Sequence, residues 1–531
     1  MELMKTDKTT LSEEDILKYI ADYELEQVPE LFKLWEYYRG KNTTILERKA
    51  PDQNTPDNKV PIPYGRKIVT TFTGYAYRPR YITYKPVESE EDVEKRRIEK
   101  EEAKIVEKEA AYKRLPGEPL PLPEVKEKAP KTAEDIFASE LQDIFDHNNE
   151  HIKTSRAGRN TGIFGLSYEI LYIKGVLNKG EDKAKLPVKA EVRFFSVDPR
   201  EMILLYNYDS EPEKVAAIRY YKIDNDYYKV EVFYLDKILQ YDRKREKDGL
   251  GGSKWKLTLK GQYTNFFGEI PVVAYYFGDE MNGVIDPVVP MIDAYDVLVS
   301  DSLNEFDRFA YAYLIMKRFG LTDPTKKKEP GVVAQILRDL KKRRVFENLP
   351  KDAEIEFLTK DIPDEFITFM TGLLKEEIHV QSHVPDFASE KFASGVSGIA
   401  VQRLLFDFEN VVSSTEADFD VGLMERIRLI TIIMEKSRAG GGSPDMINIS
   451  HKRNIPLNLS DFAKTSKTMK EAGFSSWLCA DIMPDDVVPN VEEELERQKE
   501  EREEMMPDID QFNEEDEDED EEEDDNLEGE E

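Results

Sequence analysis

A stretch of about forty residues, from Gly398 to about Ser437, has the pattern of one continuous helix. Its stripe recurs every three or four residues, at Phe408, Val412, Thr415, Phe419, Leu423, Ile427, Ile430 and Met434. Ser397 can cap the first turn. At 1.5 Å per residue such a helix is about 60 Å long, more than the diameter of a small domain. We therefore expect an elongated molecule, or else a helix kinked at Gly422.

The chain before this helix alternates between helix and strand patterns. Ser12 and Asp15 form a capping box, Pro29 opens a second helix, and residues 132–155 predict a third. Runs rich in Tyr, Phe, Val and Ile then predict a mostly antiparallel β region of about 115 residues. The runs are Ser167–Ile173, Val188–Phe195, Ile203–Tyr206, Ala216–Ile223, Tyr227–Leu235, Ile238–Arg243, Lys254–Leu259 and Ile270–Phe277. The fold class we expect is α+β.

A second long stripe follows the β region, with spacings that alternate between four and three. It comprises Val288, Ile292, Tyr295, Val299, Ser302, Phe306, Phe309 and Tyr313, and the acidic residues of this stretch fall off it. This heptad-like pattern predicts a helix packed along another helix, although an ordinary core helix would have a similar apolar pattern. A short mixed region, 317–360, follows, with a helix at Val332–Lys342 and a strand at Glu354–Leu358. Another helix runs from Pro363 to about His383.

Charge is distributed unevenly along the chain. The formal net charge is −34, and 17 acidic residues with no basic ones lie between Asp508 and Glu531. Such a tail is either a solubilising segment, an interaction arm or a repulsive lining. Residues 88–130 are highly charged and then rich in proline, which indicates an insertion between folded parts. One basic cluster opposes the trend, and it is either a solvated helix end or a docking patch for an acidic partner or for phosphates. It comprises Lys326, Lys327, Lys328, Arg338, Lys341, Lys342, Arg343 and Arg344.

Sequence motifs for catalysis are weak. Residues His147, Glu150 and His151 match H-x-x-E-H, which could hold zinc, but no third ligand is identifiable. The sequence has no phosphate-binding G-x-x-x-x-G-K-[ST] loop and no G-x-S-x-G, and Cys479 is its one cysteine. No apolar run reaches about 18 residues, so we expect no membrane contact. The chain is therefore not expected to be an enzyme or to need a metal or cofactor.

Several stretches in order resemble the portal proteins of tailed bacteriophages, in the group typical of siphophages of Gram-positive hosts. They are LFKLWEYYRGKNTTILER, DNKVPIPYGRKIVTTFTGYAYRPRYITY, TAEDIFASELQDIFDHNNEHIKTSRAGRNTGIFGLSYEILYI, VIDPVVPMIDAYDVLVSDSLNEFDRFAYAYLIMK and SGVSGIAVQRLLFDFE. Together they cover most of residues 25–435. Arg78 stands where the family usually has a glycine, and the insertion 88–130 and the acidic tail also depart from its pattern.

The resemblance implies a portal fold, mainly helical, with a β-rich wing. Residues 1–285 would form the wing, 286–316 the first stem helix, 317–360 the clip and 361–384 the second stem helix. Residues 385–397 would form the tunnel loop, 398–437 a long helix that returns to wing and crown, and 438–504 the crown. Residues 505–531 would be a disordered acidic tail.

The resemblance also implies function and partners. The chain would form a ring, usually of twelve subunits, at the capsid portal vertex of the virion, after assembly in the host cytoplasm. Double-stranded DNA would pass through without sequence specificity during packaging and ejection. The terminase motor and then head-completion or adaptor proteins would dock on the basic cluster in the clip, and the ring would also meet the major capsid and scaffolding proteins.

Residue roles follow from the same resemblance. The DNA-facing tunnel loop would include Ser389, Glu390, Lys391, Ser394 and Gly395. The stem would pack through Ile292, Tyr295, Val299, Phe306 and Phe309. Two alternatives remain open at this point. One is a zinc-dependent hydrolase that uses 147–151, and the other is an acidic-tailed assembly chaperone.

Overall fold

The computed structural model describes most of the chain: residues 3–50, 56–87, 132–175, 190–247, 253–278, 280–310, 313–317, 354–358, 364–389, 392, 403–437, 442–453 and 459–483, with a few positions between 487 and 498. These residues divide into two compact units. The larger unit comprises Met1–Asp386 and Asp407–Asn454, and the smaller unit comprises Phe387–Phe406 and Ile455–Glu531. The insertion 88–130 and the acidic tail lie outside the described residues.

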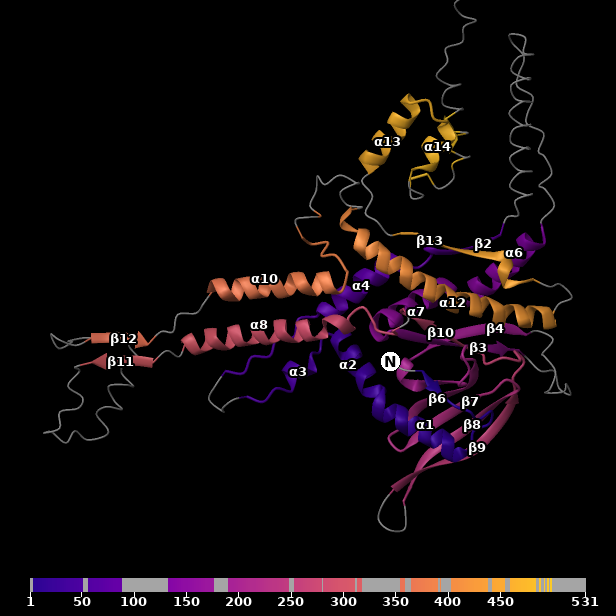
Figure 1. Cartoon of the computed structure of the whole chain (residues 1–531), viewed down its shortest axis with the longest axis horizontal. Coiled ribbons are helices and arrows are strands. Elements are labelled where there is room, and N and C mark those ends of the chain that lie inside the picture. Colours follow the sequence, from indigo (N-terminus) through magenta and orange to yellow (C-terminus); the bar gives the residue numbers. More distant parts are fainter. Residues whose placement is uncertain are drawn as a thin grey trace, which may run out of the picture. The chain divides into compact units, whose positions relative to one another are not determined.

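Two β-sheets form the centre of the larger unit (Figure 1). The six-stranded sheet has the order β1-β5-β6-β7-β8-β9 and the three-stranded sheet the order β10-β3-β4. All eight predicted strands are confirmed: β3 (Leu166–Lys174), β4 (Glu191–Val197), β5 (Met202–Tyr206), β6 (Lys214–Asp224), β7 (Tyr227–Phe233), β8 (Lys237–Lys247), β9 (Ser253–Thr264) and β10 (Val272–Tyr276). Strand β1 (Met4–Lys5), which pairs in parallel with β5, was not predicted.

The facing sides of the two sheets enclose an apolar core. Leu166, Ile170 and Val272 of the three-stranded sheet pack in one cluster with Met202 and Phe233 of the six-stranded sheet. Side chains alternate between the two faces of a strand, so one side of each sheet supplies this core while the other meets helices or solvent. The mixture of packed sheets and helices confirms the α+β fold class.

The N-terminal helices begin where the sequence predicts. Helix α1 (Glu13–Glu26) starts at the Ser12 capping box, in which the Ser12 side chain accepts a hydrogen bond from Asp15 N. Helix α2 (Val28–Tyr38) carries Pro29 in its first turn and ends before Gly40, whose φ of 74° suits glycine. Two further helices follow, α3 (Thr43–Leu46) and α4 (Tyr64–Ala76).

The single helix predicted for residues 132–155 is wrong, because two helices occupy this stretch. Helix α6 (Ala133–Asn148) ends at Asn149, which has a φ of 51° in the left-handed region, and helix α7 (Glu150–Phe164) starts immediately after it. Asparagine is one of the few residues other than glycine that adopts this conformation readily. Helix α7 then packs on the three-stranded sheet.

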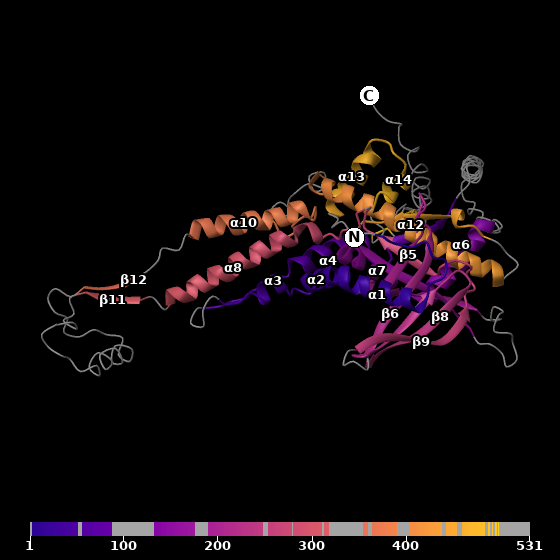
Figure 2. The same ribbon diagram turned by 60° about the horizontal axis from the view of Figure 1, so that its bottom comes forward.

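Helices α8 (Val289–Ala310) and α10 (Asp364–Gln381) lie side by side (Figures 1 and 2). The antiparallel strands β11 (Tyr313–Lys317) and β12 (Glu354–Leu358) follow α8 and precede α10, and β12 confirms the predicted strand. Tyr313 was predicted to extend the helical stripe, but it belongs to β11, so the helix is shorter than predicted. The predicted helix Val332–Lys342 lies outside the described residues.

Helix α12 (Phe406–Ser437) confirms most of the helix predicted for Gly398 to about Ser437. A turn at Leu405 precedes it, and the predicted first turns at 398–402 lie outside the described residues. Gly422, where a kink was the alternative prediction, lies within the continuous helix. An added Cβ at Gly422 would meet the Tyr275 ring at 2.5 Å, so the glycine allows α12 to approach β10 closely. The chain then forms β13 (Ile447–His451), which pairs antiparallel with β2 (Ile82–Pro86) and was not predicted.

The described part of the smaller unit contains two short helices. They are α13 (Leu459–Glu471) and α14 (Ser476–Asp481), and Cys479 of α14 is buried with a free thiol. Within the described part of the chain, no helix is long and apolar enough to cross a membrane.

Candidate functional site at the base of the paired helices

Tyr64, the first residue of α4, lies between the bases of α8 and α10. Its ring meets that of Tyr295 on α8 edge-on, with 5.1 Å between centroids. It meets the ring of His379 on α10 at 6.2 Å, also edge-on. Edge-to-face pairs of this kind are favourable beyond the area they bury. One aromatic side chain therefore joins both long helices to the body of the larger unit.

A ladder of polar side chains attaches α8 to an extended segment, residues 58–62. Asp296, Ser300 and Asn304 are buried at 0, 0 and 7% exposure. They accept hydrogen bonds from the backbone N–H groups of Ile62, Val60 and Asn58, at 3.0, 3.1 and 2.6 Å.

The spacing of the two partners explains this ladder. Four residues advance a helix by about 6 Å, and two residues advance an extended chain by about 6.6 Å, so the two repeats stay nearly in register. In the part of the chain that the structure describes, no strand pairs with this segment, and the helix side chains satisfy its partly buried N–H groups instead. The ladder thus fixes the position of α8 on the N-terminal part of the chain.

Asp296 has an unusual environment within the ladder. Burial raises its pKa to about 6, although hydrogen bonds from Asn42 Nδ2 and the Ile62 N–H oppose the rise. Asp293, one turn earlier, accepts a hydrogen bond from the Tyr37 hydroxyl. Polar residues that the sequence places off the apolar stripe therefore contact other parts of the same chain. The sequence signal for the ladder was the spacing of four between Asp296, Ser300 and Asn304. The ladder was not predicted from it, because polar residues at such a spacing normally form the solvent-facing side of a helix.

The other sides of α8 and α10 expose large apolar side chains. Phe306 of α8 is 66% exposed, and Phe366 and Phe369 of α10 are 58 and 64% exposed. Leu303 and Leu373 are 41 and 40% exposed. Several large apolar side chains exposed on two paired helices are typical of a protein–protein interface.

The residues predicted to pack the stem lie in different environments. Ile292 is buried, Tyr295 and Val299 are half-buried, and Phe306 is exposed. The side chain of Phe309 lies outside the described residues. The inner half of the predicted stripe therefore packs within this subunit, and Phe306 in its outer half faces outward.

Asp386, the last residue of the larger unit before its boundary with the smaller unit and the second residue of the predicted tunnel loop (385–397), is held by two lysines. Lys67 Nζ of α4 lies 2.7 Å from Asp386 Oδ1, and Lys375 Nζ of α10 lies 2.9 Å from Oδ2. Burial alone would raise the pKa of this carboxyl, but the two lysines hold it well below its ordinary value. His379 Nδ1 lies 2.9 Å from the Val384 carbonyl oxygen and so also fixes the approach to the loop.

The predicted loop and clip residues are mostly not described. Ser389 lies at a bend, whereas Glu390, Lys391, Ser394 and Gly395 lie outside the described residues. The whole basic cluster, Lys326 to Arg344, also lies outside them.

A second charged cluster lies along α12, near its N-terminal end. Arg453, just after β13, donates to both carboxylate oxygens of Glu416 at 2.6 and 2.7 Å and to Glu409 at 2.6 Å. His451 Nε2 lies 2.8 Å from Asp420, and its Nδ1 lies 3.3 Å from Glu416 without hydrogen-bond geometry. Burial alone would lower the pKa of His451, but these carboxylates raise it to about 9.

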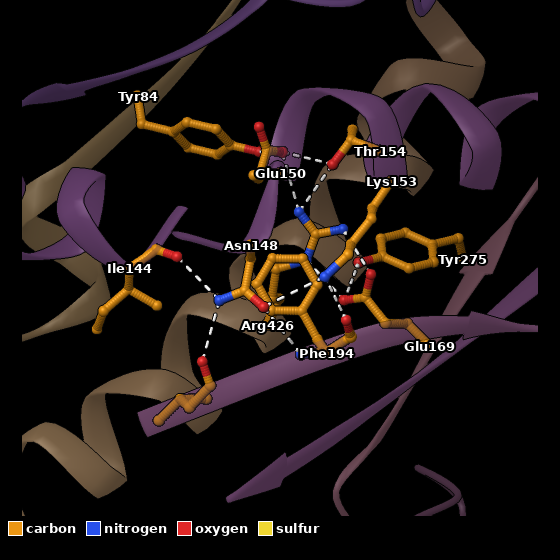
Figure 3. Close-up of polar contacts among 11 residues, drawn as sticks. Tyr84, Ile144, Asn148, Glu150, Lys153, Thr154, Glu169, Phe194, Tyr275 and Arg426 are labelled. Carbon is orange, nitrogen blue, oxygen red and sulfur yellow. Dashed lines mark hydrogen bonds and ion pairs between the residues drawn. The ribbon is translucent and has the colours of Figure 1, made fainter. Parts of the chain in front are cut away.

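A third network surrounds Arg426 of α12, which is fully buried (Figure 3). Its guanidinium donates to Glu169 of β3 at 2.7 and 3.2 Å and to Glu150 of α7 at 3.0 Å. The Tyr84 hydroxyl donates to Glu150 at 2.7 Å, and the Arg426 guanidinium lies over the Phe194 ring. Burial raises the pKa of Glu169, and Arg426 opposes that rise. The network connects helix α12 to the three-stranded sheet.

The contacts of Glu150 in this network test the zinc site suggested by the H-x-x-E-H motif at 147–151. Glu150 turns its carboxylate toward Arg426, while His147 lies on α6 with its Nδ1 2.6 Å from the Asp143 carbonyl oxygen. The break at Asn149 separates His147 from His151 on α7, so the two imidazoles do not lie one turn apart on one helix. Among the described residues, no group of three or more His, Cys, Asp or Glu side chains could hold a metal ion. The geometry does not support the zinc hydrolase alternative.

Comparisons with known proteins agree with the resemblance seen in the sequence. The family described as "Phage portal protein, SPP1 Gp6-like" matches residues 17–508. A relative, the portal protein of Bacillus phage SPP1, is 22% identical over 342 residues, which are 62% of this chain and 66% of the relative. The chain thus matches slightly less than two thirds of that protein's length.

A solved structure titled "Neck of native GTA particle computed with C12 symmetry" contains a chain with a TM-score of 0.36 and 9% identity. That match covers 65% of this chain and 84% of the other, and a likeness of this size supports no inference about function.

The family match extends over nearly the whole chain, from within α1 to beyond α14. The family is structural rather than enzymatic, which confirms that the chain is not an enzyme and argues against the hydrolase alternative. The family match also argues against the chaperone alternative, because the proteins of this family are head–tail connector components of the virion. The chain belongs to the phage portal protein family of the SPP1 Gp6 type.

Proposed function

We propose that copies of this chain close into a ring at the unique vertex of a phage capsid. Double-stranded DNA passes through the ring into the capsid during packaging and out of it during ejection. The terminase motor docks on the ring first, and head-completion proteins dock later. The observation that carries this proposal is the exposed apolar surface of the α8–α10 pair in a chain of the portal family.

The parts of the chain take their roles from this proposal. Helices α8 and α10 form the stem, and residues 317–360 between them form the clip. The sheets and N-terminal helices form the wing, residues 385–397 the tunnel loop, and residues 438–504 the crown. The tunnel-loop residues Ser389, Glu390, Lys391, Ser394 and Gly395 face the DNA.

Ring closure accounts for the apolar residues on the stem. A head-to-tail interface joins one side of each subunit to the other side of its neighbour, and a rotation that closes produces a ring. Burial of one exposed Phe side chain contributes about 1.5–3 kcal/mol. Phe306, Phe366 and Phe369 are each more than half exposed. Their burial against a neighbouring subunit would together contribute several kcal/mol to the free energy of association at each subunit interface.

The charge of the stem suits a passage for DNA. Helices α8 and α10 carry nine carboxylates and two basic residues; Asp296 is buried in the ladder, and the other eight carboxylates still outnumber the cations. Basic surfaces bind phosphates by releasing counterions, and this would slow sliding. An acidic stem holds the duplex loosely and lets it move.

One experiment tests the ring surface. Phe306→Glu with Phe369→Glu places two charges on the stem, whereas Leu25→Glu places one at a 77% exposed position on α1. Sedimentation velocity of the wild-type chain should show a large ring, which the stem variant loses and the Leu25 variant keeps. Equal assembly of the stem variant and the wild type would refute the assignment of this surface.

A second experiment tests docking on the clip. Reversal of the charges at Lys341, Lys342, Arg343 and Arg344 should impair DNA packaging while rings still assemble, because an acidic partner loses its basic contact. Packaging yields equal to those of the wild type would remove the docking role of this cluster.

A further inference from the structure

The chain passes between its two units at three places. These are Asp386/Phe387, Phe406/Asp407 and Asn454/Ile455. The segment Phe387–Phe406 therefore leaves the larger unit and returns to it, and it groups with the C-terminal residues from Ile455 onward. The larger unit holds the chain beside each crossing through polar contacts, and α4 takes part at the first two.

The first crossing is fixed from α4 by Lys67. Its ammonium donates to Asp386 Oδ1 at 2.7 Å, and the Asp386 side chain is 9% exposed. Lys375 of α10 lies 2.9 Å from the other carboxylate oxygen, so the aspartate is held from both sides. Charge-assisted hydrogen bonds to a largely buried carboxylate are stronger than those at an open surface.

The second crossing is fixed from the same helix by Tyr75. Its hydroxyl donates to Glu409 Oε2 at 2.7 Å, three residues after Phe406. Its ring lies 4.7 Å from that of Phe408, which is 1% exposed. The other oxygen of Glu409 accepts from Arg453 Nε at 2.6 Å, one residue before the third crossing. Glu409 therefore connects the second crossing with the third.

From these contacts we infer that α4 fixes the chain on both sides of residues 387–406, Lys67 through Asp386 and Tyr75 through Glu409. The two residues are eight positions apart on one helix, which separates their backbones by about 12 Å along its axis. A rigid helix thus holds both Asp386 and Glu409. This inference rests on the proposed function where it assigns residues 385–397 to the tunnel loop, and it makes Lys67 a positioning residue for the start of that loop and Tyr75 a positioning residue for the start of α12.

Hydrogen exchange of the full-length chain tests the inference. Lys67→Met removes the contact with Asp386, and Tyr75→Phe removes only the hydroxyl bond to Glu409 and keeps the ring on Phe408. Thr70→Ala, at an exposed position between them on α4, is the matched control. Loss of one charge-assisted hydrogen bond should raise local exchange on the order of tenfold. We expect the rise at 384–389 for Lys67→Met and at 403–409 for Tyr75→Phe.

A conservative variant and distant peptides serve as controls in this exchange experiment. Lys67→Arg should restore the wild-type exchange at 384–389, and peptides of β6 to β8 should be unchanged in every variant. Unchanged exchange at both ends, or an equal rise in Thr70→Ala, would overturn the inference. A rise at one end alone would overturn the claim that α4 positions both. Exchange is measured without DNA, so failure of the wild-type chain to form rings would count against the proposed function and leave this result standing.

Discussion

Replacement of Arg426 by methionine is the most severe single change that the structure suggests. Arg426 and Glu169 are both 0% exposed, and the Glu150 side chain is 8% exposed. The variant would leave two buried carboxylates without their cation. Removal of one partner from a buried ion pair costs about 3–5 kcal/mol, because the remaining charge stays desolvated. We therefore expect a loss of that size in the stability of the region around α12.

Lys256→Met is the matched control for this variant. Lys256 pairs with Glu246 at 3.2 Å, but both side chains are about 60% exposed. A pair of this kind contributes less than about 1 kcal/mol. Glu169→Gln combined with Arg426→Met should recover part of the loss, since it removes one uncompensated charge.

Amide exchange of β3 and α12 as a function of urea measures this loss. A local measurement is needed because a chain of two units has no single two-state free energy of unfolding. Burial without Arg426 raises the pKa of Glu169 further, so the variant should regain stability as pH falls from 7 toward 5. A loss no larger than that of Lys256→Met, or a loss independent of pH, would refute this account of the network.

Other predictions concern single groups. The folded-state pKa of His451 is about 9 against an ordinary 6.5, so the attachment of β13 should weaken as pH rises from 6.5 through 9. Exchange of β13 amides would show this, and His451→Gln should abolish the pH dependence. The pKa of Asp296 is about 6 against 3.8, so the ladder on α8 should weaken as pH rises from 4 to 6, and Asp296→Asn should remove that slope in exchange at 58–62. Gly158→Ala puts a Cβ 2.3 Å from the Tyr77 ring and should lower the local stability of α7 by about 1–3 kcal/mol, measured by amide exchange, while Gly372→Ala, with open space, should not destabilise α10.

The strands were predictable because their sequence signal is local. Runs of Tyr, Phe, Val and Ile between turn residues mark each of β3 to β10, and all eight were found. The break at Asn149 was missed because no glycine or proline marks it, and the helical pattern continues on both sides. Strand β1 was missed because two residues carry no periodicity.

The contacts that position α8, α10 and α12 were not predictable from the sequence. Arg426 and Glu169 are 257 positions apart, and each alone reads as a surface charge. The same holds for Lys67 and Asp386, which are 319 positions apart. These pairs become evident only when the fold brings their elements together. The family, in contrast, was predictable because the order of several short motifs carries it.

The mass of the purified full-length chain, measured by native mass spectrometry with electron micrographs of the same sample, tests the central proposal most directly. We expect a closed assembly of about twelve copies with a central opening, because the exposed stem residues need a neighbour on each side. A single copy of 61.5 kDa at every concentration tried would contradict the proposal.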